Sequence, residues 1–199
     1  MANKNESIKC IILHGGKFYS AGNDLSKFAQ ADSVENMKKL AEYGVKEVMS
    51  KMLKTFCDSH KPIIAVVTGA CYGIAFTMLS LADFVYCTPE VVFCAPFIKS
   101  FQSPEGSSIL SFREIFGARF AAEILLLDKE VTAKEALHHG FVTKVLDNQP
   151  ITGDDLDYNK VPCLRYLQQA DYKTLVNCKV MMNEGRNPKR YHEIIDYEA

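Results

Sequence analysis

The chain has 199 residues, of which 48% are hydrophobic and 24% are charged, so we expect one globular domain, residues 1–199, with a substantial core. Its formal net charge is −1 and no basic block stands out. Nucleic acid is therefore excluded as an expected partner, because phosphate binding needs a concentrated positive patch. No apolar run approaches the length of a membrane-spanning helix, and the N-terminal MANKNESIKC lacks the apolar core of a secretory signal.

The cysteines and histidines show no metal-binding pattern. The seven cysteines include no CxxC pair, and the five histidines include no HExxH motif, so we expect no metal site. An odd number of scattered thiols, several inside apolar runs, favours burial in a reducing compartment over a disulfide framework.

The first third of the chain predicts two strands and one long helix. The run 8–16 is continuous, apolar and β-branched, and it ends in Gly-Gly, which is typical of a buried strand. A loop follows, and then apolar residues at three- and four-residue spacings predict a helix over 33–56 with Ser33 as its N-cap. The run 61–69 is a second expected buried strand.

The rest of the chain continues the alternation. We expect a small-residue helix over 73–83, two short strands at 84–88 and 91–95, and helices over 107–127 that break at Gly117. A compact helix over 132–140 is predicted from Thr132 as cap, Glu135 as partner in a capping box, and Gly140 as terminator. A strand at 141–146, a polar connection at 147–162 and a helix over 171–185 complete the pattern.

Strands that alternate with helices predict an α/β fold with a largely parallel sheet. Binding sites in such folds gather where strands end and helices begin, and the loops Ser20–Leu25 and Gly69–Ile74 lie at such places. Their small residues let backbone N–H groups approach a ligand, and two such donors converging on a carbonyl oxygen form an oxyanion hole. The alternative is that each glycine-containing loop only turns the chain.

One carboxylate stands out in the segment FQSPEGSSIL, residues 101–110. Glu105 lies between a proline and a glycine, with an apolar run before it and the start of an expected helix after it. It is either a turn residue on the surface or a carboxylate held at the mouth of an apolar pocket, where its pKa would rise.

Three segments together resemble one family. GGKFYSAGNDL, KPIIAVVTGACYGIAFTMLSLADFVYCT and VTAKEALHHGFVTKVL are similar, in order and spacing, to signatures of the crotonase (enoyl-CoA hydratase/isomerase) superfamily. The likeness covers most of residues 8–147. SAGNDL together with SPEG looks most like the peroxisomal-type Δ3,Δ2-enoyl-CoA isomerases. The resemblance implies an α/β fold with a crotonase-like (ββα)n spiral core.

The resemblance also implies roles for particular residues. The backbone N–H groups of Asn23 and Ile74 would hold the thioester oxygen of an acyl-CoA, and Glu105 would move the proton. The other residues expected to contact substrate are Ser20, Ala21, Gly22, Asp24, Leu25, Gly73, Phe97 and Phe101. Asp24 is expected to brace the loop, or to form only an Asx turn. An apolar pocket lined by Phe97, Phe101 and Ile74 would raise the pKa of Glu105.

The sequence departs from the hydratases of the superfamily. The two positions where hydratases carry glutamates are Thr77 and Phe97 here, so hydration by that mechanism is disfavoured. One carboxylate is sufficient to move a proton from C2 to C4 of a 3-enoyl thioester. Gln102 and Ser103 either orient Glu105 or only satisfy the turn.

Compared with family members, the chain looks shortened at both ends, which opens a non-catalytic alternative. In it the protein is an acyl-CoA-binding or assembly module of crotonase fold. The resemblance further implies an acyl-CoA partner, no metal or redox cofactor, and a homo-oligomer, either a trimer or a hexamer. Relatives of this subgroup work in peroxisomes or mitochondria, but the C-terminal DYEA is not a peroxisomal signal and the start is not an Arg-rich transit peptide.

Overall fold

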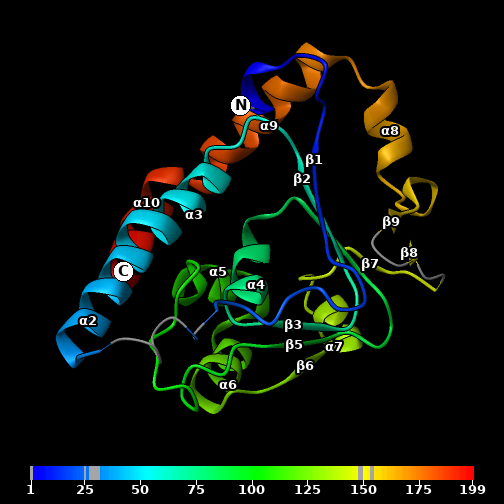
Figure 1. The fold of residues 1–199 in the computed structure, drawn as a ribbon. Coiled ribbons are helices and arrows are strands. Elements are labelled where there is room, and N and C mark those ends of the chain that lie inside the picture. The colour runs from blue at the N-terminus through cyan, green and yellow to red at the C-terminus, as the bar shows by residue number, and fades with distance from the viewer. Residues whose placement is uncertain (1, 25, 27–31, 148–149, 153–154) are drawn as a thin grey trace.

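The computed structural model describes residues 2–24, 26, 32–147, 150–152 and 155–199 (Figure 1). Four parallel strands form the first sheet in the order β1-β2-β4-β7. They are β1 (Ile11–His14), β2 (Ile63–Val67), β4 (Phe84–Cys87) and β7 (Lys144–Val145). All five residues of β2 are buried, as expected for a β-branched run in the centre of a sheet covered on both faces.

β1 is less buried than its sequence predicts. Ile11, Ile12 and Leu13 are half-buried and His14 is exposed. The reason is its position, because β1 pairs only with β2 and no other described strand lies along its outer edge. Its apolar run resembles that of a central strand, whereas its place in the sheet is at the edge.

A second sheet contains β3 (Ala70–Tyr72), β5 (Val92–Cys94) and β6 (Val131–Thr132), in that order. β3 pairs in parallel with β5, and β6 pairs antiparallel to β5. The sequence predicts a loop where β3 lies, because two glycines bound a segment of only three residues. Tertiary pairing with β5 makes it a strand. A separate hairpin joins β8 (Ile151–Thr152) and β9 (Asp155–Leu156).

The long helix predicted from Ser33 is present as α2 (Val34–Tyr43), the π-helical η2 (Gly44–Met49) and α3 (Ser50–Cys57). The Ser33 side chain accepts a hydrogen bond from the Asn36 N–H (3.2 Å), so the predicted N-cap is confirmed. The predicted helix over 171–185 is α9 (Tyr172–Arg186). Two helices that the sequence analysis missed are α8 (Leu164–Gln169) and α10 (Pro188–Glu198). Figure 1 shows α10 running alongside α3.

Shorter helices surround the second sheet (Figure 1). They are α4 (Ile74–Thr77), the 3-10 helix η3 (Met78–Leu81), α5 (Ser108–Phe116), α6 (Ala118–Leu127) and α7 (Ala133–His138). Among them, η3 contacts α3, α5 contacts α10, and α7 contacts β6 and β7. The break predicted at Gly117 separates α5 from α6, and the capping box of Thr132 and Glu135 at α7 is confirmed. Two further 3-10 turns are η1 (Ala2–Lys4) and η4 (Tyr158–Lys160).

An aromatic cluster fixes the position of α4. The fully buried Phe76 ring lies 4.8 Å from the Phe112 ring, 5.1 Å from Phe141 and 5.2 Å from Phe93, measured between centroids. Tilted and edge-on aromatic contacts of this kind add to the stabilisation from burial. Because Phe76 is anchored, Ile74 and Thr77 on the same short helix are held in place.

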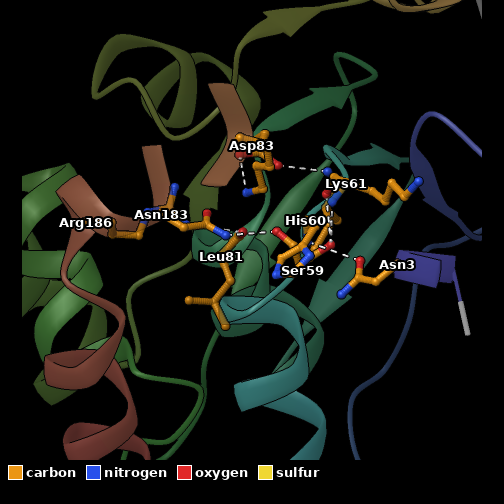
Figure 2. A network of polar contacts seen from close by, with 10 residues as sticks. Asn3, Ser59, His60, Lys61, Leu81, Asp83, Asn183 and Arg186 are labelled. Atoms are coloured by element: carbon orange, nitrogen blue, oxygen red, sulfur yellow. Dashed lines mark hydrogen bonds and ion pairs between the residues drawn. The ribbon is translucent and has the colours of Figure 1, made fainter. Parts of the chain in front are cut away.

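A polar network connects helix α9 to the amino ends of two strands of the first sheet (Figure 2). Asp83 precedes β4, and its buried carboxylate accepts a hydrogen bond from the Ile63 N–H (2.8 Å) while pairing with the buried Lys179 ammonium of α9 at 2.7 Å. Asn183 of the same helix donates to the Ser59 carbonyl (2.8 Å). The network ties α9 to the amino ends of β2 and β4, whereas the glycine-containing loops follow the carboxyl ends of β1 and β2.

Candidate active site

Three separate segments of the chain surround a cavity of about 120 Å³. The segments are the loop after β1, the turn from β3 into α4, and the stretch between β5 and α5. The residues that line the cavity are Ala21, Gly22, Asn23, Tyr72, Gly73, Ile74, Pro96, Phe97, Ser100, Gln102 and Glu105. Most of the residues predicted from the sequence as catalytic or substrate-binding therefore meet at one place.

Backbone contacts hold the first loop against β3. The Ser20 N–H donates to the Ala70 carbonyl (3.2 Å), and the Tyr72 N–H donates to the Ser20 carbonyl (2.9 Å). Gly22 has φ +91°, and a Cβ at this position would lie 2.9 Å from the Tyr72 carbonyl oxygen. Only glycine allows this approach without strain, and the approach places Asn23 beside the start of α4.

Two backbone N–H groups point to a ligand site at the cavity because they lack an acceptor in the described structure. Among the residues that the structure describes, nothing accepts from the N–H of Asn23 or from the N–H of Ile74. Ile74 is the first residue of α4, where N–H groups have no partner within the helix. Both residues line the cavity, so both donors are available to a ligand there.

Glu105 is the only carboxylate among the described residues that line this cavity. Its Oε1 lies 3.3 Å from the Thr77 hydroxyl, and its buried Oε2 has no hydrogen-bond partner within the described part of the chain. The pKa of Glu105 is raised to about 8 in total, with burial as the main cause, the Thr77 hydroxyl opposing the rise and the nearby Glu198 carboxylate adding to it. The predicted upward pKa shift is confirmed, so the choice between a surface turn residue and a buried carboxylate is decided for the latter.

Gly106 brings Glu105 against Thr77. Gly106 has φ +75°, and a Cβ there would collide with the Thr77 side chain, 2.6 Å from its Cβ. Thr77 is completely buried, so it has no room to move aside. The sequence analysis treated Thr77 only as a missing glutamate and overlooked it as a hydrogen-bond partner.

Some predicted site residues lie elsewhere. The prediction for Phe101 is wrong in this structure, because its side chain is 98% exposed and its φ of +56° turns the residue away from the cavity. Ser20 braces the loop, with its hydroxyl accepting from the Gly22 N–H (3.2 Å), and does not line the cavity. Asp24 accepts from the Ser26 N–H (2.9 Å), as an Asx turn does. Leu25 lies outside the described residues.

Neither Gln102 nor Ser103 forms a hydrogen bond with the Glu105 side chain. The Gln102 side chain lines the cavity and accepts from the Ser100 hydroxyl (2.9 Å), so it satisfies the turn. Phe97 is 2% exposed and lines the cavity as predicted. Tyr72, which is not among the substrate-binding residues predicted above, also lines the cavity. Its position follows from β3, an element that local patterns did not predict.

The described residues offer neither a metal-binding cluster nor a membrane-spanning helix. In the described part of the chain, no group of three or more histidine, cysteine, aspartate or glutamate side chains is arranged to hold a metal ion. Within the same residues, no helix combines the length and apolar character needed to cross a membrane.

Comparison with known proteins gives the family. The sequence model described as enoyl-CoA hydratase/isomerase matches residues 1–198. The chain belongs to the enoyl-CoA hydratase/isomerase family. A crystal structure of an enoyl-CoA hydratase/isomerase from Acinetobacter baumannii, assigned to that class by likeness, matches 99% of this chain and 77% of its own, with a TM-score of 0.81 and 25% identity. The α/β crotonase fold predicted from the sequence is thereby confirmed.

Two relatives carry isomerase names. Enoyl-CoA delta isomerase 2 of Rattus norvegicus is 38% identical over 144 residues, which are 72% of this chain and 36% of that protein. Enoyl-CoA delta isomerase 3, peroxisomal, of Mus musculus is 34% identical over 72% of this chain and 44% of its own length. The chain thus spans less than half the length of these relatives. Enzymes of this family require no metal or redox cofactor, in agreement with the prediction.

Proposed function

We propose that this chain converts 3-enoyl-CoA to trans-2-enoyl-CoA in fatty-acid oxidation. The observation that carries the proposal is the single buried carboxylate, Glu105, in a cavity that also holds two unpaired backbone N–H donors. The isomerase names of the relatives described above support the same reaction class.

The reaction needs one proton to move between two carbon atoms. The Glu105 carboxylate removes a proton from C2 of the bound 3-enoyl thioester, and the electron pair of that C–H bond spreads into the thioester and the C3–C4 double bond. The negative charge lies largely on the thioester oxygen. Protonation at C4 by the same carboxyl group then leaves the double bond between C2 and C3. A raised pKa makes the carboxylate a stronger base for the C2 proton, and the resulting carboxyl is still acidic enough to return the proton to C4 of the more basic intermediate.

The N–H groups of Asn23 and Ile74 are the proposed donors to the thioester oxygen. Two preorganised donors contribute about 3 kcal/mol each where charge develops in the transition state. Ala21, Gly22 and Gly73 line the cavity with small residues, so the thioester can approach the backbone closely. Phe97 supplies an apolar wall and keeps water from the carbanionic intermediate.

The absence of a second carboxylate favours isomerisation over hydration. Water addition by the two-glutamate mechanism needs a carboxylate to activate water and another to protonate carbon. Thr77 and Phe97 occupy the corresponding positions, and Glu105 stands alone among the described residues lining the cavity.

The proposal extends to the assembly and the compartment. We expect the chain, or the protein that contains it, to form a trimer or hexamer and to work in peroxisomes or mitochondria. The compartment is supported by the peroxisomal name of one relative.

The test is turnover of 3-hexenoyl-CoA by the purified chain, followed as formation of 2-hexenoyl-CoA. Glu105→Gln should lower kcat by about 10²–10⁴-fold, whereas Glu35→Gln, a carboxylate-to-amide change on exposed α2, should leave it unchanged. If the parent binds acyl-CoA without any turnover, the non-catalytic binding module is the better description. If Glu105→Gln retains full turnover, the proton shuttle lies elsewhere.

A further inference from the structure

Helix α5 begins at Ser108, three positions after Glu105, and the side chain of its N-cap residue does not cap it. Its N-cap residue Ser107 has φ +62° and forms no side-chain cap hydrogen bond. The hydroxyl oxygens of Ser107 and Ser108 are buried without a hydrogen-bond partner among the described residues. Something other than the local sequence must therefore hold this helix start in place.

That role falls to Glu198 near the end of α10. Its Oε2 accepts from the Ser107 N–H (2.6 Å) and its Oε1 accepts from the Ile109 N–H (3.1 Å). A carboxylate at the start of a helix also interacts favourably with the helix dipole. The two hydrogen bonds cross 91 and 89 positions of sequence, so they fix the segment after Glu105 to a distant helix.

Glu198 and Glu105 also line one very small cavity of about 10 Å³, which is separate from the proposed substrate cavity. The residues lining it are Val45, Met49, Ser50, Leu53, Glu105, Gly106, Ile195, Glu198 and Ala199. Among these described residues, the two glutamates are the only ones with a titratable side chain. A space of this volume holds at most about one water molecule, so little solvent screens one carboxylate from the other.

We propose that Glu198 is a positioning residue for the catalytic glutamate. It holds the backbone from Gly106 to Ile109 through two N–H groups and places a second negative charge behind the Glu105 carboxyl. This inference rests on the isomerase function proposed above, because it assigns Glu198 a part in tuning that same proton shuttle.

The electrostatic effect is a repulsion between two buried carboxyl groups. Burial raises the pKa of Glu198 to about 7, against the opposing effect of the Ile109 and Ser107 N–H groups. When Glu198 is ionised, its charge opposes ionisation of Glu105 and raises the pKa of that carboxyl. Of the other charged or titratable groups of α10, Asp196 pairs with Lys54 of α3, Arg190 with Glu114 of α5 and His192 with Asp58.

The direct test is an NMR titration of the chain labelled with ¹³Cδ-glutamate. The Glu105 signal is assigned by its loss in Glu105→Gln. In Glu198→Gln the titration midpoint of Glu105 should move to lower pH, because the neighbouring charge is gone. Asp196→Asn is the matched control, since it removes an exposed carboxylate two positions away on the same helix, and it should leave the midpoint where it is.

Kinetics on 3-hexenoyl-CoA test the positioning. Glu198→Ala should lower kcat about 10–100-fold, because small misplacements of a reacting group have effects of this size, while KM changes by less than about twofold. Asp196→Asn should behave as the parent. If Glu198→Ala fails to fold, Glu198→Gln, which keeps an acceptor oxygen for α5, is used instead. With the neighbouring charge gone, the pH profile of kcat/KM should shift to lower pH, together with the Glu105 midpoint.

An unchanged Glu105 midpoint in Glu198→Gln, or parental kcat in folded Glu198→Ala, would overturn the inference. These outcomes differ from failure of the proposed function. In that case the parent itself would show no turnover, and the NMR titration would still report whether Glu198 acts on Glu105.

Discussion

The Thr77 hydroxyl lies 3.3 Å from Oε1 of Glu105, while Oε2 of the same carboxyl is buried and has no hydrogen-bond partner among the residues that the structure describes. One oxygen of the carboxyl is therefore held by the protein and the other is left for a proton. The carbonyls of Gly73 and Ile74, at 3.5 and 3.4 Å, are alternative acceptors for the Thr77 proton. The hydroxyl can thus donate to an ionised Glu105, or accept from a neutral one while donating to the backbone.

The pH dependence of activity should follow the ionisation of Glu105. The base that removes the C2 proton must be ionised, so kcat/KM for 3-hexenoyl-CoA should rise with pH and level off above about 8, the raised pKa of Glu105. The measurement is kcat/KM between pH 5 and pH 10. A profile already flat from pH 5 upward would show that the base has an ordinary carboxylate pKa and is not this buried group.

Thr77→Val should move the same profile upward in pH. The Thr77 hydroxyl lowers the pKa of Glu105, so its removal leaves the carboxylate with one fewer donor at nearly constant side-chain shape. We expect lower kcat/KM at pH 7 and recovery toward the parental value above pH 9. A uniform loss at every pH would instead indicate that Thr77 acts only by packing.

Gly106→Ala should displace Glu105. A Cβ at this position meets the buried Thr77 side chain, and φ of +75° is strained for alanine. We expect kcat to fall by about 10²-fold and Tm to drop. Gly185→Ala is the control, because a Cβ there has open space. Parental activity in Gly106→Ala would mean that the 105–109 segment adapts without moving the carboxyl.

Glu105 should lower the stability of the protein at high pH. Its pKa is raised from 4.5 in the unfolded reference to about 8 in the folded state, so the folded state binds the proton more tightly. The stabilisation that comes from this tighter proton binding is fully present below about pH 4.5 and is lost as the pH rises through 8. Glu105→Gln should therefore be more stable than the parent at pH 9, by about 1 kcal/mol or more, and nearly equal at pH 4. Urea unfolding of both proteins at pH 4 and pH 9 measures their free energies of unfolding. The same difference between Glu105→Gln and the parent at both pH values would contradict the prediction.

The Asp83–Lys179 pair should matter far more to stability than the surface pairs. Both side chains are nearly inaccessible, at 6% and 4% exposed, and burial lowers the pKa of Lys179. Asp83→Asn leaves that ammonium without its counter-charge and should lower the free energy of unfolding by about 3 kcal/mol. Glu42→Gln, which breaks an exposed pair on α2, should leave the urea midpoint nearly unchanged. Equal effects of the two changes would show that Asp83 is better solvated than its burial indicates.

The sequence by itself determined the features that depend on neighbouring residues. Ser33 and the Thr132–Glu135 capping box act within one helical turn, and both were predicted correctly. The apolar run of β2 and the break at Gly117 are likewise local. The motifs around Asn23, Ile74 and Glu105 identified the family, because their residue types and spacing are specific even before the fold is known.

Only the tertiary structure decided which distant groups meet. Thr77 and Glu105 are 28 positions apart, and Glu198 and Ser107 are 91 apart. Neither contact leaves a periodic or local signal in the sequence. Phe101 has the large apolar side chain expected of a pocket residue. Its backbone is left-handed, however, and the residue is exposed to solvent. The pKa of Glu105 depends on burial by several packed elements, and burial is a property of the assembled fold that no single segment carries.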